Sequence, residues 1–215
     1  MLGWLHRAAD RHGVESRERK WELYQRKFPP RRGERVLDVG VSQLDDLPGE
    51  NYFLRKYPFS DQLTAVGVDD QTELRVRYPE VNFVQADGRD LPFGDKSFDV
   101  VHSNAVLEHV GPKEEQRRFV TELVRVAHAG FITTPNQWFL FETHTRVPVL
   151  HWLPRRLSAP MMVRFGHQPW RVWLLSSRSL RDLFPRSADV SVQSQRFVGW
   201  PATLIALFDT RHRGP

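Results

Sequence analysis

The segment VQADGRDLPFGDKSFDVVHSNAVLEHV, residues 84–110, contains the features that decide the fold. Its first apolar run ends at Asp87 and Gly88, and a second run, FDVVHSN at 98–104, ends in polar residues. Short continuous apolar runs suit strands that are buried on both faces, as in a parallel sheet. In an open parallel sheet, ligands bind at the carboxyl ends of the strands. The segment therefore predicts two parallel strands and part of a ligand site.

The same pattern of a short apolar run closed by glycine or a polar residue recurs along the chain. It predicts parallel strands at residues 35–40, 63–70, 81–88, 98–104 and 130–136. Helices are predicted between them, at residues 51–57, 71–78 and 112–128. A further helix at 177–184 precedes two expected antiparallel closing strands, at 188–199 and 202–209. This alternation predicts an α/β, Rossmann-like doubly wound sheet, mostly parallel, with helices on both faces.

The N-terminal residues 1–34 read as a helical segment that leads into the sheet. Trp21, Tyr24 and Phe28 fall at helical spacing and can form one apolar stripe. The consecutive prolines at 29–30 end that helix. The chain length suits one domain, and we expect a single domain over residues 1–215.

The composition excludes several kinds of site. The sequence contains no cysteine, which rules out disulfides, thiolate zinc sites and cysteine nucleophiles. The net charge is +5, and basic residues form small clusters such as Arg17, Arg19 and Lys20. No cluster interleaves with aromatic residues as nucleic-acid grooves do, so we favour the arginine usage of a GC-rich genome over an anion-binding surface. The N-terminus lacks the apolar segment of a secretory signal, and we expect a cytoplasmic protein.

Acidic residues recur at the ends of successive predicted strands. Asp38, Asp69 and Asp87 each lie in or directly after an apolar run. A carboxylate after the second strand can accept hydrogen bonds from both vicinal hydroxyls of a ribose. Each acid alone could simply cap the following helix, but capping gives no reason for the repetition. The three acids together predict a nucleoside site.

The order of the blocks VLDVG (36–40), AVGVDD (65–70), the opening segment and FITTPN (131–136) resembles that of class I S-adenosylmethionine-dependent methyltransferases. The methyltransferase type 11 group is the most similar. The specific part is acid-Gly-x-Asp-Leu-Pro-Phe, followed by Phe-Asp-Val-Val and Leu-Glu-His-Val. The resemblance covers residues 33–136. It implies a seven-stranded sheet with a C-terminal antiparallel hairpin, and S-adenosyl-L-methionine as the cofactor.

The resemblance also implies a set of cofactor-binding residues at the strand ends. They are Asp38, Gly40, Ser42, Asp69, Asp70, Asp87, Gly88, Ser103 and Asn104. Asp38 and Gly40 would face the methionine part of the cofactor, and Asp69 would hold the ribose. Those after the third strand would bracket the adenine, and those ending the fourth would lie beside the sulfonium and its methyl group.

The loop after the first strand departs from the family pattern. The family usually has Gly-x-Gly-x-Gly there, whereas this sequence keeps Gly40 and has Ser42 and Leu44 at the later positions. Asp69 follows Asp38 by 31 positions, against about 20 in the general dinucleotide pattern, so the first loop is longer. A pyrophosphate needs bare backbone pressed against it, and the missing glycines therefore argue against NAD or FAD. S-adenosylmethionine has no phosphate, and its carboxylate needs only a few amide donors.

An oxygen nucleophile often needs a general base, and several residues in or after the fourth strand could serve. The candidates are His109, His144 and Glu142, together with His102 and His151. In small-RNA 2′-O-methyltransferases and some ubiquinone-pathway O-methyltransferases, a Glu-His pair like the one at 108–109 helps to hold a divalent metal, with a further glutamate three residues earlier. This sequence has Ala105 there. We therefore expect no metal, and keep Glu108, His109 and His144 as an alternative set of metal ligands.

Residues 137–173 are rich in tryptophan, phenylalanine and methionine, interrupted by arginine and proline. We expect a substrate-facing cover here. It could line an apolar acceptor pocket, touch a membrane surface beside a lipid-linked substrate, or simply pack over the sheet edge. The sequence thus predicts methyl transfer to a small-molecule, glycan or lipid-like acceptor, with oxygen as the favoured atom. The alternatives are an RNA methyltransferase and a non-catalytic domain that kept the fold.

Overall fold

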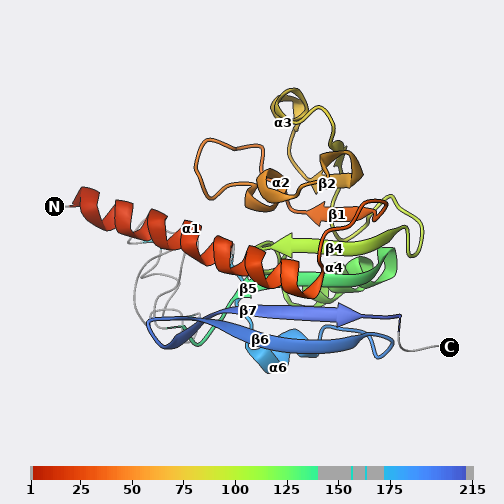
Figure 1. Cartoon of the computed structure of the whole chain (residues 1–215). Helices are drawn as coiled ribbons and strands as arrows, with labels where there is room; N and C mark the ends of the chain where they lie inside the picture. The colour runs from red at the N-terminus through yellow and green to blue at the C-terminus, as the bar shows by residue number, and fades with distance from the viewer. Residues whose placement is uncertain (1, 140–155, 157–162, 164–171, 212–215) are drawn as a thin grey trace.

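A seven-stranded sheet organises the molecule, with strand order β3-β2-β1-β4-β5-β7-β6 (Figure 1). The computed structural model describes residues 2–139, 156, 163 and 172–211. The strands are β1 (Val36–Val39), β2 (Leu63–Gly67), β3 (Asn82–Gln85), β4 (Phe98–Asn104), β5 (Ala127–Pro135), β6 (Asp189–Phe197) and β7 (Trp200–Asp209). Strands β1 to β5 are parallel, and β7 runs antiparallel to both β5 and β6. The predicted doubly wound sheet with a closing hairpin is confirmed.

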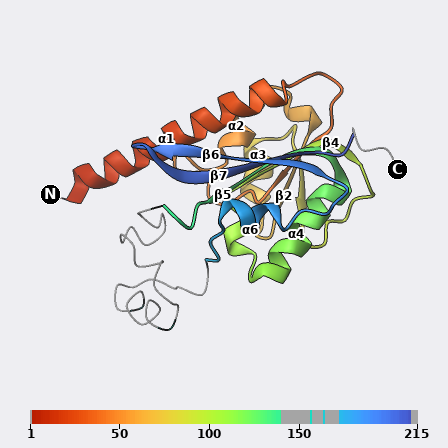
Figure 2. The same ribbon diagram turned by 90° about the horizontal axis from the view of Figure 1, so that it is seen from below.

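Helices lie on both faces of this sheet (Figure 2). They are α1 (Leu2–Lys27), α2 (Tyr52–Lys56), α3 (Thr72–Arg77), α4 (Lys113–Val126) and α6 (Ser177–Arg181). Two short 3-10 helices, η1 (Ser60–Gln62) and η2 (Leu107–His109), lie in the connections. Buried residues of α4 and α6 share one core cluster, and those of α1, α2 and α3 share another. The sheet is therefore the middle of three layers.

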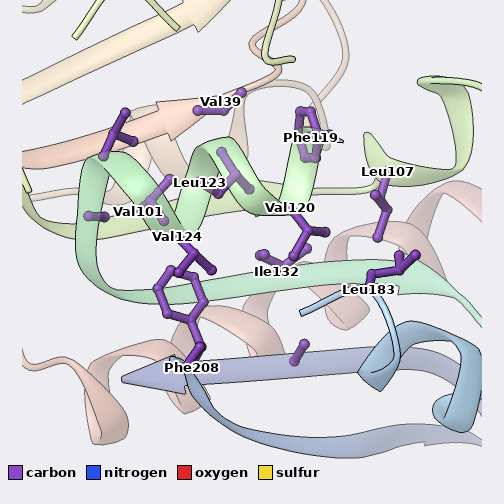
Figure 3. Packing of buried hydrophobic residues seen from close by; sticks show 14 of the residues in the cluster. Val39, Val101, Leu107, Phe119, Val120, Leu123, Val124, Ile132, Leu183 and Phe208 are labelled. Carbon is purple, nitrogen blue, oxygen red and sulfur yellow. The ribbon is translucent and has the colours of Figure 1, made fainter. Parts of the chain in front are cut away.

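Successive side chains of the central strands point to opposite faces of the sheet and so pack into the two core clusters in turn. Val36 packs with α1 and α2, whereas its neighbour Leu37 packs with α4. All four residues of β1 are buried, because its neighbours β2 and β4 cover both edges and helices cover both faces. The α4 layer is shown in Figure 3, where Phe119, Val120, Leu123 and Val124 lie beside Val39, Val101, Ile132 and Phe208.

The end of α4 differs from the sequence expectation. The pattern predicted a helix to residue 128, but α4 ends at Val126 and β5 begins at Ala127. Ala127 is already extended and pairs with Phe98 of β4. Lys96 donates through Nζ to the carbonyls of Val124 (2.7 Å) and Ala127 (2.9 Å). A cation bonded to these last carbonyls stabilises the helix end two residues earlier than the pattern suggested.

The turn of the closing hairpin lies two residues earlier than the sequence suggested, at residues 198–199 and not at 200–201. Val198 and Gly199 both have positive φ, 47° and 80°, as a two-residue hairpin turn requires. β7 consequently begins at Trp200. Pro201 lies beside the register shift after Gln195, where the ladder is already interrupted.

The helices of the described residues are all too short or too polar to span a membrane.

Gly130 tests the packing at the centre of the sheet. A Cβ at this position would lie 2.2 Å from Cε1 of Phe208 and 2.8 Å from Cγ1 of Val101. Because both neighbours are buried, Gly130→Ala should lower the free energy of unfolding by about 1–3 kcal/mol. Urea denaturation measures the difference. In the control, exposed Gly94→Ala, the added Cβ meets Ser97 only at 3.4 Å, and equal losses in both variants would contradict this packing.

Candidate functional site

A cavity of about 200 Å³ opens at the carboxyl ends of β1 and β4. These strands are neighbours in the sheet, although β2 and β3 lie between them in the chain. The strand order reverses at this point, which is where ligands bind in open α/β sheets. The cavity is lined by one face of α1, the end of β1 and its loop, segment 49–53, and the end of β4.

Gly40, directly after β1, adopts a conformation that few other residues adopt. Its φ is +100°, and a Cβ there would lie 2.1 Å from Cγ2 of Val106. The amides of Gly40 and Val41 both donate to the carbonyl of Val66, at 2.7 and 3.1 Å. These two amides are therefore directed at β2 and are not available to a ligand.

The loop that follows is closed by Asn51, which has φ 43°. The Ser42 amide donates to Oδ1 of Asn51 (2.9 Å), and Nδ2 of Asn51 donates back to the carbonyls of Ser42 and Leu44. Oγ of Ser42 accepts the Leu44 amide at 3.1 Å. Ser42 thus lines the cavity while its amide and hydroxyl hold the loop together.

Asp45 is the buried centre of the same loop. Its side chain is 4% exposed, and its carboxylate accepts hydrogen bonds from Arg55 (2.6 Å), Arg77 (2.7 Å) and Tyr78 (2.8 Å). Burial alone would raise the pKa of Asp45, but these hydrogen bonds outweigh it and hold the pKa below its usual value. The network ties the loop to α2 and to the end of α3. Sequence reasoning did not identify Asp45.

The two acids after β2 have different surroundings. Asp70 accepts hydrogen bonds from the hydroxyl (2.7 Å) and the amide (3.0 Å) of Thr72, the first residue of α3, and these bonds lower its pKa. Asp69 is exposed, and its carboxylate makes no hydrogen bond or ion pair with the described residues. Of these two predicted cofactor-binding residues, Asp69, the predicted ribose ligand, is the one whose carboxylate is open to a ligand.

After β3, Asp87 is engaged by Arg89. The Arg89 side chain contacts both carboxylate oxygens, at 2.6 to 3.0 Å, and also binds Glu115 at 2.7 Å. The hydrogen bonds from Arg89 hold the pKa of Asp87 below its usual value. Asp87 remains 43% exposed, so its carboxylate can still accept from a ligand. A Cβ at Gly88 would lie 2.4 Å from the Phe119 ring, which gives this glycine a packing role.

At the end of β4, alternate side chains point in different directions. Nδ1 of His102 lies 2.7 Å from Oδ1 of Asp38, and the His102 ring stacks on Phe53 with centroids 3.9 Å apart. Ser103 is fully buried and donates to the Val39 carbonyl (2.9 Å), so it does not line the cavity. Asn104 does line it.

Two basic residues of α1 also line the cavity and were not assigned a role by sequence reasoning. Nζ of Lys20 donates to Oδ1 of Asn104 at 2.6 Å, and Arg17 lies one turn earlier on the same face. Burial, together with the positive charge of Arg17, lowers the pKa of Lys20 to about 7. Their spacing from Trp21 and Tyr24, on the predicted apolar stripe, is the signal that could have identified them.

The predicted catalytic residues are only partly described. Nε2 of His109 lies 3.9 Å from Oε1 of Glu108, whose other oxygen accepts a hydrogen bond from Thr134 (3.0 Å). Glu142 and His144, and with them most of the expected cover at 137–173, lie outside the described residues. Within the described ranges, no group of three or more histidine, aspartate or glutamate side chains is placed to hold a metal ion.

The structure thus separates the predicted cofactor residues into groups. Asp38, Gly40, Ser42 and Asn104 line the cavity. The residues after β2 and β3 lie along the same edge of the sheet, beside the cavity, because parallel strands end at the same edge. The site thus combines the exposed carboxylate of Asp69, just after β2, with a cavity between the ends of β1 and β4 that is lined by both acidic and basic side chains.

Comparison with known proteins agrees with this fold. Residues 49–132 match the model of a methyltransferase domain. A probable S-adenosylmethionine-dependent methyltransferase of Mycobacterium tuberculosis is 32% identical over 143 residues, which cover 64% of this chain and 48% of the relative. A fatty-acid O-methyltransferase of Mycolicibacterium smegmatis is 30% identical over 138 residues, which cover 61% of this chain and 45% of the relative. The chain spans about half the length of these curated relatives.

Among solved structures, a methyltransferase described as S-adenosylmethionine-dependent from Methanosarcina mazei superposes with a TM-score of 0.57. The match covers 83% of this chain and 92% of that one, at 15% identity, and so concerns the fold alone. The predicted resemblance to S-adenosylmethionine-dependent methyltransferases, and to the Rossmann-like fold of that class, is confirmed.

Replacing Asp45 tests the network that shapes the first loop. Asp45→Asn should lower the free energy of unfolding by about 2 kcal/mol at neutral pH, because hydrogen bonds to a buried charge are lost. The folded-state pKa of Asp45 is depressed, so its stabilisation is complete above the unfolded pKa of about 4 and disappears as the pH falls through the folded value. Denaturation of both proteins between pH 7 and pH 2 measures this.

Asp46→Asn, at the exposed neighbouring carboxylate, is the matched control and should leave the free energy of unfolding nearly unchanged. A difference between wild type and Asp45→Asn that stayed constant down to the lowest pH would show that the network is not ionic.

Proposed function

We propose that this chain, whose residues 49–132 match a methyltransferase domain, transfers a methyl group from S-adenosyl-L-methionine to an oxygen atom. The acceptor is a small molecule, a glycan or a lipid-like compound. One observation carries the proposal. The carboxylate of Asp69, without a partner in the described chain, and the cavity between β1 and β4 lie along one edge of the sheet.

The residues present fit a nucleoside with an amino-acid end. Asp69 at the end of β2 has both oxygens open to the two ribose hydroxyls. Asp87, after β3, would accept a hydrogen bond from the adenine amino group, since its carboxylate stays 43% exposed although Arg89 binds it. From there the ligand would extend across β1 towards Asn104 on β4.

The same residues do not suit a dinucleotide. The amides of Gly40 and Val41 are bonded to Val66, and the Ser42 amide is bonded to Asn51. A pyrophosphate would need several free amides in this turn. S-adenosyl-L-methionine, when bound, supplies an electrophilic methyl group on sulfur.

The chain's contribution to the reaction is chiefly alignment, which can provide most of the acceleration in such a transfer. Oδ1 of Asn104 is occupied by Lys20 (2.6 Å) and by the Thr133 hydroxyl (2.8 Å). The Nδ2 donors are therefore the part of this amide that remains for a ligand. A donor fixed in this way suits the oxygen of an acceptor more than a carbon.

The choice of acceptor draws on the relatives as well as on the sequence. One of them is named a fatty-acid O-methyltransferase, which supports an oxygen atom and a lipid-like compound. The aromatic composition of residues 137–173 suits an apolar acceptor. His109, Glu142 and His144 remain candidates for the general base.

Binding of S-adenosylhomocysteine tests the cofactor assignment. Titration calorimetry should detect binding to the wild type, and Asp69→Ala should weaken it at least tenfold, because two hydrogen bonds to an ionised acceptor are lost. Asp61→Ala removes an exposed carboxylate before β2, at the opposite end of that strand, and should leave the affinity unchanged. The ribose assignment is wrong if Asp69→Ala binds like the wild type. Absence of binding to the wild type at millimolar ligand would identify a non-catalytic domain.

Label transfer tests the acceptor. With methyl-labelled S-adenosyl-L-methionine, hexadecanoic acid should become labelled, and hydriodic acid, which cleaves O–CH3 bonds, should release the label. Total RNA is the comparison substrate. Labelling of RNA, with a rate that falls steeply as salt is added, would instead support the RNA methyltransferase alternative. Label that resists hydriodic acid would place the methyl group on carbon and overturn the oxygen assignment.

A further inference from the structure

Two cations on the inner face of α1 lie in the cavity wall without a direct ion pair. Arg17 and Lys20 both line the cavity, and neither contacts a carboxylate of the described residues within ion-pair distance. Burial lowers the pKa of each side chain, which reflects the loss of water around its charge. Placing such charges in a cavity wall is unfavourable unless an anion binds there.

The guanidinium of Arg17 is held by one hydrogen bond, and most of its donors have no partner in the part of the chain that the structure describes. Nη1 donates to the Gly13 carbonyl at 3.0 Å, while Nε is buried and has no hydrogen-bond partner among the described residues. The group lies directly over Gly49, where a Cβ would be 3.0 Å from Cζ. The absence of a side chain at this position leaves room for the guanidinium at the cavity.

Lys20 is positioned by the end of β4. Its Nζ donates to Oδ1 of Asn104 at 2.6 Å, which occupies one of the donors of the ammonium group. Residues 17 and 20 are one turn apart on α1, so their side chains lie on the same face of the helix. Together they can present several N–H donors to one anionic group.

The first backbone amides of the loop after β1 cannot bind an anionic group, because they are already bonded within the protein. Gly40 and Val41 donate to Val66, and Ser42 donates to Asn51. In the glycine-rich loops of related folds, free amides of this turn bind the anionic part of the ligand. In this chain the cations of α1 face the cavity from the other side.

The cavity is also lined by negatively charged side chains, and this limits which anionic ligands could bind there. Asp38 and Glu50 line it, with Asp38 bonded to His102 and with the charge of Glu50 acting on Arg17. Oε2 of Glu50 accepts the Leu47 amide at 3.0 Å. Neighbouring positive and negative groups complement a zwitterion better than a simple anion. An α-amino acid carries both charges, whereas a fatty acid carries a carboxylate alone.

We infer that Arg17 and Lys20 bind the carboxylate at the α-amino-acid end of the cofactor, with Glu50 facing its ammonium group. The inference rests on the proposed function and deepens it. Side-chain cations of the N-terminal helix then perform the role that loop amides perform elsewhere. The acceptor carboxylate is the other source of the same chemistry, and the experiment distinguishes the two.

Ligands with and without the amino-acid end test the inference by calorimetry. S-adenosylhomocysteine has this end, and 5′-deoxy-5′-methylthioadenosine has the nucleoside and sulfur but lacks it. Arg17→Gln and Lys20→Gln should each weaken S-adenosylhomocysteine at least tenfold and change the affinity for methylthioadenosine less than twofold. Arg19→Gln, an exposed arginine on the same helix, is the matched control and should change neither affinity. Methylthioadenosine binding also reports that each variant is folded.

Each other outcome overturns the inference. If the wild type binds S-adenosylhomocysteine and both variants bind it equally well, the inference fails while the proposed function stands. Equal weakening of both nucleosides would show that α1 acts only through the fold. Decanoate, a fatty acid titrated into the same proteins, represents the acceptor carboxylate. If the variants lose decanoate binding and keep S-adenosylhomocysteine binding, Arg17 and Lys20 bind the acceptor carboxylate and not the cofactor. A wild type that binds neither nucleoside would remove the proposed function itself.

Discussion

The carbonyl oxygen of Val66 accepts the backbone amides of both Gly40 and Val41, and the shape of the site depends on this pair of hydrogen bonds. They continue the pairing of β1 with β2 beyond the last residue of the strand. The chain can make this turn because Gly40 adopts φ +100°, with Val106 packed where a Cβ would be. The loop therefore leaves the sheet beside β2, and the space over β4 remains open as a cavity.

A loop that starts in this way needs other sources of stability, and side chains provide them. Asn51 closes the first turn through three backbone groups, and Asp45 joins it to α2 and α3 through Arg55, Arg77 and Tyr78. Polar networks of this kind hold one conformation well when every member is satisfied. The loop is thus fixed before any ligand arrives, which favours binding because less conformational entropy is lost.

The sequence was sufficient for the strands and for most residues at their ends, because parallel strands buried on both faces leave short continuous apolar runs in the sequence. It could not show that Asp70 would bond to Thr72 while Asp69 stays open, since both acids follow the same strand. It also could not separate Ser103 from Asn104, although their opposite directions follow from the alternation of side chains once the end of β4 is known. Asp45 was missed because its partner Arg77 is 32 residues away in the chain.

Arg17 and Lys20 of α1 show a different limit of prediction from sequence. They also connect ligand binding to the packing of α1 on the sheet. The helical spacing of Arg17 and Lys20 with Trp21 and Tyr24 is visible in the sequence, but the strand ends that this face meets are set by packing. Tyr24 is buried against Phe53 and Phe131, and its burial raises its pKa well above the usual value. The face of α1 that packs on the sheet through Tyr24 thus also places Arg17 and Lys20 at the cavity. A ligand that pairs with those charges would also stabilise the docking of α1, because any ligand that binds only the folded form stabilises it. Free loop amides would give no such coupling, since they belong to the sheet and not to the N-terminal helix.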